Sequence, residues 1–450
     1  MIAPHRVLGR SSLPGTDGGI ELVDHEIGVP LDHREPDGRT VRVFARELRS
    51  VAARKRLEVG AEQPALLYLQ GGPGGRGIRP PTSSWLDKLL VDYRVIMLDQ
   101  RGTGRSTPAT ARTLAGMLDQ HGAQATADYL TNFRADAIVA DAEALRAAVV
   151  GEHPWTSLGQ SYGGFVTLTY LSQAPEGLHE CFITGGLLSP SASTREVYEH
   201  TLTTTVATNA AFFSMWPQDR TVLRRILDLL ATSDEQLPNG VALTPRLFQT
   251  IGNQLGFRNG QAQLHVSLAD AFAPSGGPGD AELLTDVFLG EVARQVSFAD
   301  DPLYAVLHES IYAQGEATNW AAAGVLAERP ELAVDAAEPC LLGEVIQPFF
   351  FDEDPALQPF ADVARILAER SDWPRLYDLA RLARNEVPVY AAVYQHDMFV
   401  PSELSLRAVG EVGNVHAWLT PDFLHDGIRD SDVVLDQLLA MAAAHRVSGS

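Results

Sequence analysis

The pattern Gly-x-Ser-x-Gly at residues 159–163 constrains the fold of this chain more than any other feature. Such a pattern holds its serine in a strained turn between a strand and a helix, with the hydroxyl raised toward a substrate. Glycines two residues before and two residues after the serine are needed because larger side chains do not fit there. Ser161 is therefore the first candidate for a nucleophile.

The residues around Ser161 fit the strand, turn and helix that this pattern requires. Residues 155–158 are partly apolar and include a β-branched threonine, as in a short buried strand. Residues 165–171 place bulky side chains at helical spacing until Pro175 ends the helix. Because the pattern alone also occurs by chance, this context supports its interpretation as a nucleophile turn.

Other segments alternate between strand-like and helix-like patterns. We expect a half-buried strand at 41–45, buried strands at 65–69, 93–98 and 387–394, and a shorter strand at 418–419. Helices are expected at 135–149 and 433–444. Strands that alternate with helices predict an α/β fold with a mostly parallel central sheet.

Residues 188–380 consist of helical segments separated by polar breaks, among them 221–230, 281–296 and 361–370. We expect an inserted, mainly helical cap domain at 188–380 and a catalytic core formed by 1–187 and 381–450. A glycine-rich stretch at 275–279 follows no hydrophobic strand, so we expect it to be a flexible connection.

The composition narrows the classes of partner. The 450 residues, 45% of them hydrophobic, can bury a large core and exceed the usual size of one domain. The formal net charge of −22 argues against binding to nucleic acid and against attachment to anionic membranes. This charge suits a cationic or neutral substrate, although it can also serve solubility alone.

Cys181 and Cys340 are far apart and lack a nearby histidine cluster, so neither a disulfide framework nor a zinc site is indicated. We expect no metal and no cofactor. The first twenty residues lack the apolar run of a secretory leader, and no segment has transmembrane length. A cytoplasmic protein is the expectation.

Two further residues complete a candidate catalytic triad with Ser161. Asp397 directly follows the strand expected at 387–394, at the end where open α/β sheets place their sites. His425 lies between the short strand and the last helix. The order Ser, Asp, His is that of an α/β-hydrolase fold, with His425 as the base and Asp397 as the orienting acid.

Three other residues compete for these roles. His396 flanks Asp397 and can instead be a surface group, whereas His416 lies before its strand, at the wrong end of the sheet. Asp426 is next to His425 in the sequence and is poorly placed to orient its ring. These comparisons favour His425 and Asp397.

A glycine-rich loop at 71–75 follows the strand expected at 65–69 and can bring backbone N–H groups close to an oxyanion. Gly72 and Tyr162 are the expected donors of the oxyanion hole. The turn at 99–106 is also rich in glycine, but it lacks the spacing of a phosphate-binding loop, and we interpret it as structural.

With these residues assembled, the chain resembles the proline iminopeptidases of the α/β-hydrolase superfamily over nearly its whole length. The resemblance rests on the segments 29–33, 71–74, 99–106, 133–136, 159–164, 302–312, 343–344 and 425–427, together with Asp397. Gln70 is a departure, because many relatives have histidine there. This difference leaves the glycines of the oxyanion loop unchanged.

The resemblance implies release of an N-terminal proline from short peptides, with the cap closing one end of the pocket. An enzyme of this kind must recognise a protonated amine, which buried carboxylates do through charge-assisted hydrogen bonds. The cap holds 27 acidic residues against 11 arginines, so candidates are plentiful. Glu309 is the first, Glu344 the second and Glu316 the third. Aromatic residues of the cap can line a proline pocket or simply pack in the core, namely Trp320, Phe349 and Phe350.

Two alternatives remain open. An esterase or amidase with the same triad would act on a small non-peptide substrate and would not require a free amine. A noncatalytic ligand-binding relative of the hydrolases is the other alternative. The sequence does not predict the oligomeric state.

Overall fold

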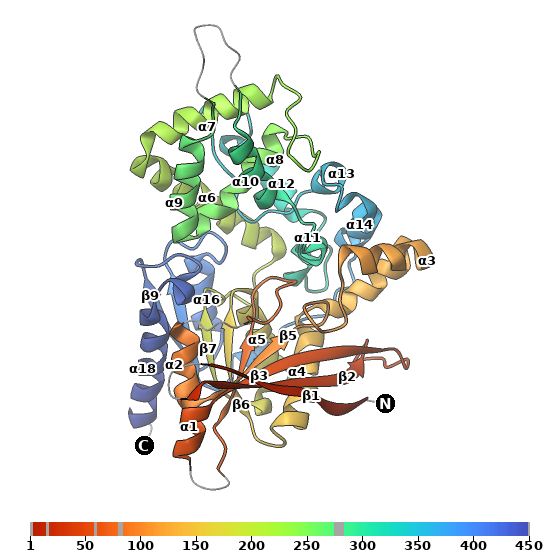
Figure 1. The fold of residues 1–450 in the computed structure, drawn as a ribbon, viewed down its shortest axis with the longest axis vertical. Helices are drawn as coiled ribbons and strands as arrows, with labels where there is room; N and C mark the ends of the chain where they lie inside the picture. The colour runs from red at the N-terminus through yellow and green to blue at the C-terminus, as the bar shows by residue number, and fades with distance from the viewer. Residues whose placement is uncertain (1–2, 15–17, 58–60, 80–83, 274–282, 449–450) are drawn as a thin grey trace.

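The computed structural model describes residues 3–14, 18–57, 61–79, 84–273 and 283–448. The glycine-rich stretch 275–279, expected to be a flexible connection, lies outside these residues. Nine strands form one sheet in the order β1-β2-β3-β5-β4-β6-β7-β8-β9 (Figure 1). The strands are β1 (Ala3–Leu13), β2 (Ile20–Pro30), β3 (Thr40–Ser50), β4 (Ala65–Leu69), β5 (Arg94–Asp99), β6 (Trp155–Gln160), β7 (Leu178–Thr184), β8 (Val389–Tyr394) and β9 (Val415–Thr420).

The strands from β5 to β9 in this order are parallel, which confirms the predicted mostly parallel central sheet. The three N-terminal strands are antiparallel and extend the sheet at one edge through the pair β3–β5. The sequence pattern did not predict β1. Most of its residues are exposed, so the strand carries no buried face that an apolar alternation could reveal.

Helices of the core cover both faces of the sheet (Figure 1). Side chains of β4 alternate between two apolar clusters, with Leu67 and Leu69 toward α4 and α5, and Leu66 and Tyr68 toward α2 and α18. Helix α4 (Ala135–Val149) has the predicted bounds. The other core helices are α1 (Val51–Arg56), α2 (Ser84–Asp92), α3 (Ala111–Leu130), η2 (Thr131–Phe133), α5 (Tyr162–Gln173), η3 (Pro175–Gly177), α16 (Ser402–Glu411), α17 (Gly427–Asp430) and α18 (Asp432–Ser448).

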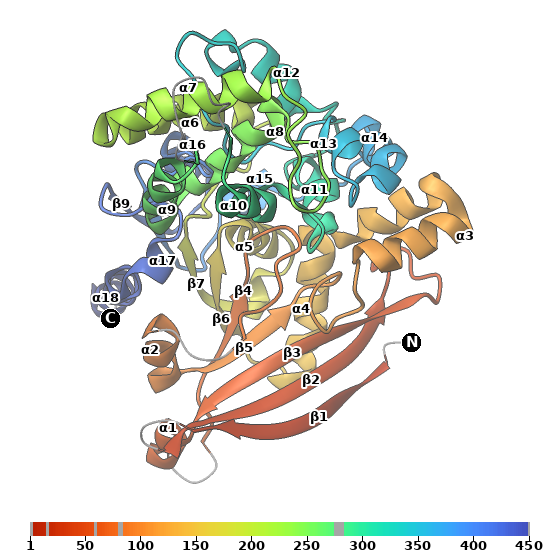
Figure 2. The ribbon, with the colours of Figure 1, turned by 45° about the horizontal axis from the view of Figure 1, so that its top comes forward.

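The segment 188–380, which we propose as the cap, lies over the carboxyl ends of the parallel strands in Figures 1 and 2, coloured from green to light blue. Its helices are α6 (Thr194–Met215), α7 (Pro217–Leu230), α8 (Pro245–Gln249), η4 (Thr250–Gly256), α9 (Arg258–Ala269), α10 (Asp286–Val296), α11 (Pro302–Leu307), η5 (Glu309–Ile311), α12 (Ala321–Ala327), η6 (Pro330–Leu332), α13 (Phe350–Glu353), η7 (Gln358–Phe360) and α14 (Ala361–Glu369). Helix α15 (Leu379–Leu382) spans the expected boundary at 380.

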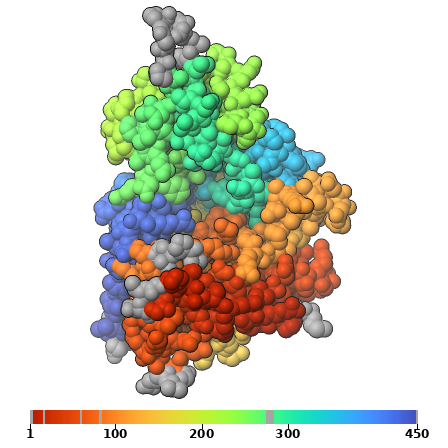
Figure 3. Space-filling model, in the orientation of Figure 1, coloured from red at the N-terminus to blue at the C-terminus, as the bar shows by residue number. Residues whose placement is uncertain are grey.

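Helix α3 belongs to the core segment of the sequence but packs against α14 of the cap (Figure 2). Arg370, directly after α14, forms an ion pair with Asp128 of α3 at 2.9 Å. On the face shown in Figure 3, cap and core form one continuous surface. Among the described helices, none combines the length and the apolar composition needed to cross a membrane.

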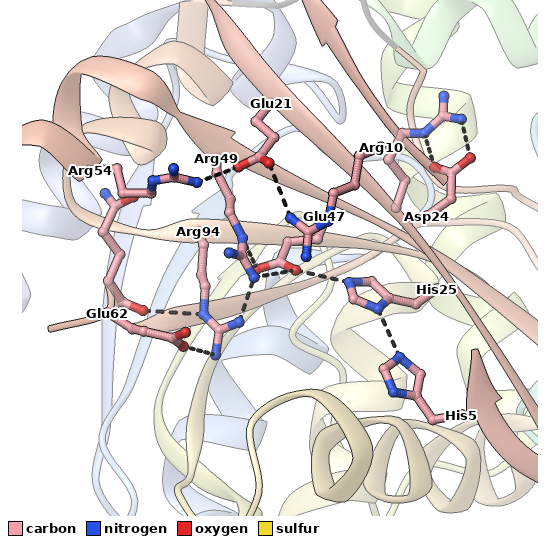
Figure 4. A network of polar contacts seen from close by, with 12 residues as sticks. His5, Arg10, Glu21, Asp24, His25, Glu47, Arg49, Arg54, Glu62 and Arg94 are labelled. Atoms are coloured by element: carbon pink, nitrogen blue, oxygen red, sulfur yellow. Dashed lines mark hydrogen bonds and ion pairs between the residues drawn. The ribbon is translucent and has the colours of Figure 1, made fainter. Parts of the chain in front are cut away.

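A buried carboxylate joins the antiparallel strands to the parallel part of the sheet (Figure 4). Glu47 of β3 is fully buried and accepts hydrogen bonds from Arg49 and from Arg94 of β5, at 2.8 and 2.9 Å. Its other oxygen lies 2.9 Å from Nε2 of His25 in β2, whose Nδ1 lies 2.9 Å from His5 of β1. Burial alone would raise the pKa of Glu47, but these partners lower it to about 2.

We predict that Glu47→Gln lowers the free energy of unfolding by about 3 to 5 kcal/mol, because buried arginines lose the carboxylate that neutralises them. Urea denaturation monitored by circular dichroism measures the change. Glu62→Gln is the matched control, since Glu62 also pairs with Arg94 but is 66% exposed. Its effect should stay below about 1 kcal/mol. Equal effects of the two variants would contradict the prediction.

Candidate active site

Ser161 occupies a sharp turn between β6 and α5, with φ of 55° and ψ of −125°. Backbone segments approach this turn so closely that only glycine fits beside it. A Cβ atom at Gly163 would lie 2.0 Å from the carbonyl oxygen of Leu69, and one at Gly164 would lie 2.2 Å from that of Gly186. The strained conformation of Ser161 is thus held by its surroundings, and the turn exposes its hydroxyl.

The structure brings Ser161, His425 and Asp397 into one hydrogen-bonded chain. Nε2 of His425 lies 2.9 Å from Oγ of Ser161, and Nδ1 lies 2.8 Å from Oδ2 of Asp397. The other oxygen of Asp397 accepts the backbone N–H groups of Phe399 and Val400, at 2.9 and 3.0 Å. These bonds fix the carboxylate, which in turn orients the imidazole.

Opposing effects act on the pKa of His425. Burial of the ring lowers the pKa, whereas the negative charge of Asp397 and, to a smaller extent, that of Glu344 raise it. The net result is a pKa above the ordinary value of 6.5. The carboxylate therefore stabilises the protonated imidazole, which is the form that a general base adopts after it takes a proton.

The loop after β4 lies directly beside Ser161. A Cβ atom at Gly71 would lie 3.0 Å from Cβ of Ser161, so the backbone of this loop passes at van der Waals distance. Tyr162 is the first residue of α5, and its N–H therefore has no acceptor within the helix. Gly72 and Tyr162, the expected oxyanion donors, thus belong to the two segments that flank Ser161.

The turn at 99–106 supports this loop. Asp99 accepts the backbone N–H of Gly77 at 3.1 Å and that of Arg105 at 2.7 Å. Gln100 donates a hydrogen bond to the carbonyl of Gln70 at 2.9 Å. These contacts give the turn a structural task in positioning the loop.

The competing residues lie apart from the hydrogen-bonded chain. His396 is exposed, although it is next to Asp397. His416 lies within β9, not before it as expected, and its ring stacks on Tyr390 near the amino ends of the strands. Asp426 is the N-cap of α17. The hydrogen-bond partner of Nδ1 of His425 is Asp397.

Gly185 and Gly186, directly after β7, were not singled out from the sequence. A Cβ atom at Gly185 would lie 3.3 Å from Oδ2 of Asp397, and one at Gly186 would lie 2.3 Å from the carbonyl oxygen of Ser161. The two glycines therefore allow the backbone to pass close to both Ser161 and Asp397. A glycine pair at the end of a strand was the signal that could have identified them.

Glu309, the first candidate for amine binding, is buried but already has hydrogen-bond partners. Its oxygens accept the backbone N–H groups of Ala321 and Ala322, at 3.1 and 2.8 Å, at the start of α12. Burial raises its pKa to about 7, against the effect of these bonds. It lines a cavity of about 20 Å³, together with Trp320. Such a volume holds about one water molecule and is too small for a proline ring.

Glu344, the second candidate, acts electrostatically on His425, since its negative charge contributes to the raised pKa of that histidine. The adjacent Gly343 packs against Met398, the residue after Asp397, where a Cβ atom would lie 2.6 Å from Cε of the methionine. Tyr304 donates a hydrogen bond to Oε1 of Glu344. The residue before Glu344 thus contacts the loop that carries the candidate acid, while the carboxylate itself is bonded to Tyr304.

Two buried tyrosines interact electrostatically with both Glu309 and Glu344. Burial raises the pKa of Tyr198 and Tyr312, and the charges of both Glu309 and Glu344 raise it further. The charge of Asp397 also acts on Tyr312. Glu316, the third candidate, lies exposed in the loop between η5 and α12. It therefore lacks the burial that an amine site of this kind requires.

The aromatic candidates are packed mainly against other side chains. Phe349 stacks on Phe350 at 4.6 Å, and Trp320 contacts Phe351 at 5.7 Å between ring centroids. These contacts favour the core-packing interpretation. Within the described ranges, no group of three or more His, Cys, Asp or Glu side chains is arranged to hold a metal ion.

Several known proteins are similar to this chain. The family model for the alpha/beta hydrolase fold matches residues 64–225. A proline iminopeptidase from Aeromonas sobria is 41% identical over 94% of this chain and 97% of its own length. A proline iminopeptidase from Aspergillus aculeatus is 34% identical over 95% of this chain and 94% of its own. The solved structure of a proline iminopeptidase from Mycobacterium smegmatis covers 94% of this chain and 99% of its own, at 14% identity and a TM-score of 0.41.

We predict that Asp397→Asn lowers the pKa of His425, because the negative charge that stabilises the imidazolium is removed. NMR titration of carbon-13-labelled histidine rings measures the shift. His416 is the internal control, since it lies at the other end of the strands and its pKa should not change. An unchanged pKa of His425 would show that Asp397 does not act on it electrostatically.

Proposed function

Because the chain belongs to the proline iminopeptidase family, we propose that it releases an N-terminal proline from short peptides with Ser161 as the nucleophile. The observation that carries this assignment is the hydrogen-bonded chain from Ser161 through His425 to Asp397. It combines a hydroxyl, a base and an orienting acid in the geometry of serine hydrolases.

In the proposed reaction, Oγ of Ser161 attacks the carbonyl carbon of the first residue while Nε2 of His425 takes the hydroxyl proton. The carbonyl oxygen becomes an oxyanion, which accepts hydrogen bonds from the backbone N–H groups of Gly72 and Tyr162. His425 then donates its proton to the leaving amine of the second residue. The peptide departs, and the proline remains bound to Ser161 as an ester.

Water completes the cycle. His425, neutral again, removes a proton from a water molecule that attacks the ester carbonyl, and the same oxyanion donors stabilise the second tetrahedral intermediate. Collapse of this intermediate releases free proline and returns the proton to Ser161. Asp397 stabilises the imidazolium in both halves of the reaction.

Recognition of the free amine is the second part of the proposal. A protonated N-terminus needs an anionic acceptor that is partly shielded from water. We assign this contact to Glu344, whose side chain is 23% exposed and whose charge reaches His425. Glu309 is less suited to this contact, because its oxygens are held by α12 and burial raises its pKa to about 7. Glu316 is left out of this assignment because it is exposed.

We also propose a cytoplasmic location. Cys181 and Cys340 are both free and buried in the structure. A chain with two unpaired thiols suits a reducing compartment.

We predict that Ser161→Ala lowers kcat for prolyl-2-naphthylamide by about 10⁴-fold or more, because the nucleophile is absent. The variant should fold normally and should no longer react with a fluorophosphonate probe. Ser157→Ala is the matched control, since Ser157 is a buried serine of β6, the strand that precedes Ser161. Full activity of the Ser161 variant, or no labelling of the wild type, would exclude the proposed chemistry.

We predict that Glu344→Gln lowers kcat/KM for prolyl-2-naphthylamide by about tenfold to a hundredfold, since a hydrogen bond to a charged amine is weakened. Hydrolysis of cyclopentanecarbonyl-2-naphthylamide, which has the ring but no amine, should be unchanged. The exposed Glu316→Gln serves as the control and should leave both substrates unaffected. An equal loss on both substrates would remove Glu344 from amine recognition. A wild type that hydrolyses the two substrates equally well would favour the esterase or amidase alternative.

A further inference from the structure

His308 is buried with both of its ring nitrogens unpaired. It connects α11 with η5, and its side chain is 1% exposed. Among the described residues, none forms a hydrogen bond with Nδ1 or Nε2. Buried polar side chains normally have partners, and those without one require a specific explanation.

The surroundings of His308 hold its ring in one orientation. The ring stacks on Tyr304, with 4.9 Å between centroids, and it meets the edge of Tyr312 at 6.1 Å. Nε2 lies 4.0 Å from Oε2 of Glu344, which is too long for a hydrogen bond. Tyr304 donates its hydroxyl proton to the other oxygen of the same carboxylate. Oε2 of Glu344 and Nε2 of His308 are therefore neighbours that do not share a hydrogen bond.

The ring of His308 is suited to accept a hydrogen bond. Burial lowers its pKa, and this effect exceeds the opposing effect of Glu344. The imidazole is therefore neutral at neutral pH and keeps one nitrogen with a free lone pair.

We propose that His308 is a specificity-determining residue that accepts the second N–H bond of the substrate's terminal amine, while Glu344 accepts the first. This inference rests on the proposed function. An ammonium nitrogen placed at about 2.8 to 2.9 Å from both acceptor atoms subtends an angle of about 90° across their 4.0 Å separation. This angle is close to the tetrahedral angle of about 109° between two N–H bonds, a deviation that hydrogen bonds tolerate.

The number of acceptors matches the chemistry of proline. The nitrogen of an N-terminal proline belongs to the ring, so its protonated form has two N–H bonds where other residues have three. Glu344 and His308 together supply one acceptor for each of them. A site with these two acceptors leaves neither N–H bond of the proline unpaired in a buried position, where an unmade bond is costly.

The test compares prolyl-2-naphthylamide with its amine-free analogue cyclopentanecarbonyl-2-naphthylamide, in wild type, His308→Phe and His308→Gln. Phenylalanine keeps the stacking on Tyr304 and removes the acceptor, whereas glutamine offers an amide oxygen in its place. We expect His308→Phe to lower kcat/KM for the prolyl substrate by about tenfold to a hundredfold, mostly through KM. The amine-free substrate should be hydrolysed as before, and His308→Gln should recover part of the loss.

Thermal unfolding and fluorophosphonate labelling are the controls for folding and for the triad. Replacement of an unpaired buried imidazole by an apolar ring should not lower the melting temperature. An equal loss on both substrates, or an unchanged KM for the prolyl substrate, would overturn the role of His308. If the wild type does not prefer the prolyl substrate, both this inference and the proposed function fail. If the wild type prefers the prolyl substrate but His308→Phe loses activity equally on both substrates, the inference alone is refuted.

Discussion

The conformation of Ser161 is the constraint on which the rest of the site depends. Its positive φ is unfavourable for a residue with a side chain. The surrounding backbone maintains this conformation, because it packs so closely against Gly163 and Gly164 that neither position has space for a Cβ atom. Two neighbouring strands, β4 and β7, supply the backbone that presses on this turn. The loops after these strands, at Gly71 and at Gly186, consequently approach the serine from opposite sides.

The proposed cap contacts the loops around Ser161 and Asp397 at glycine residues. Gly74 of the oxyanion loop lies against Asp301 at the start of α11, and Gly256 at the end of η4 lies against Phe399, two residues after Asp397. The backbone N–H of His425 donates to the carbonyl of Gly256 at 3.2 Å. A helical insertion that is distant in sequence therefore contacts the loops of the oxyanion site, the acid and the base.

Local patterns in the sequence predicted the parallel strands β4, β5, β6, β8 and part of β9, because each contains a short apolar run that is followed by a turn, but they did not predict β7. Ser161, Asp397 and His425 could be proposed for the same reason, since each lies directly after a strand or beside the last helix. Local patterns could not show which of Glu309 and Glu344 is the better candidate for binding the substrate amine. The bonds of Glu309 to α12 and the proximity of Glu344 to the loop of Asp397 are contacts between distant segments. Strand β1 escaped prediction because its pairing with β2, and not an apolar face, defines it.

The contact between α3 and α14 makes residues 188–380 and the rest of the chain depend on each other for burial of apolar surface. Helix α3 precedes the nucleophile in the sequence, yet apolar side chains along it, including Leu114 and Leu118, belong to a cluster that continues into the cap. Removal of residues 188–380 would leave this surface open to water, with an unpaired Asp128 at its edge. The catalytic core is consequently not a free-standing module from which the insertion could be excised. Truncation or domain exchange at these boundaries would have to replace the cover of α3 as well.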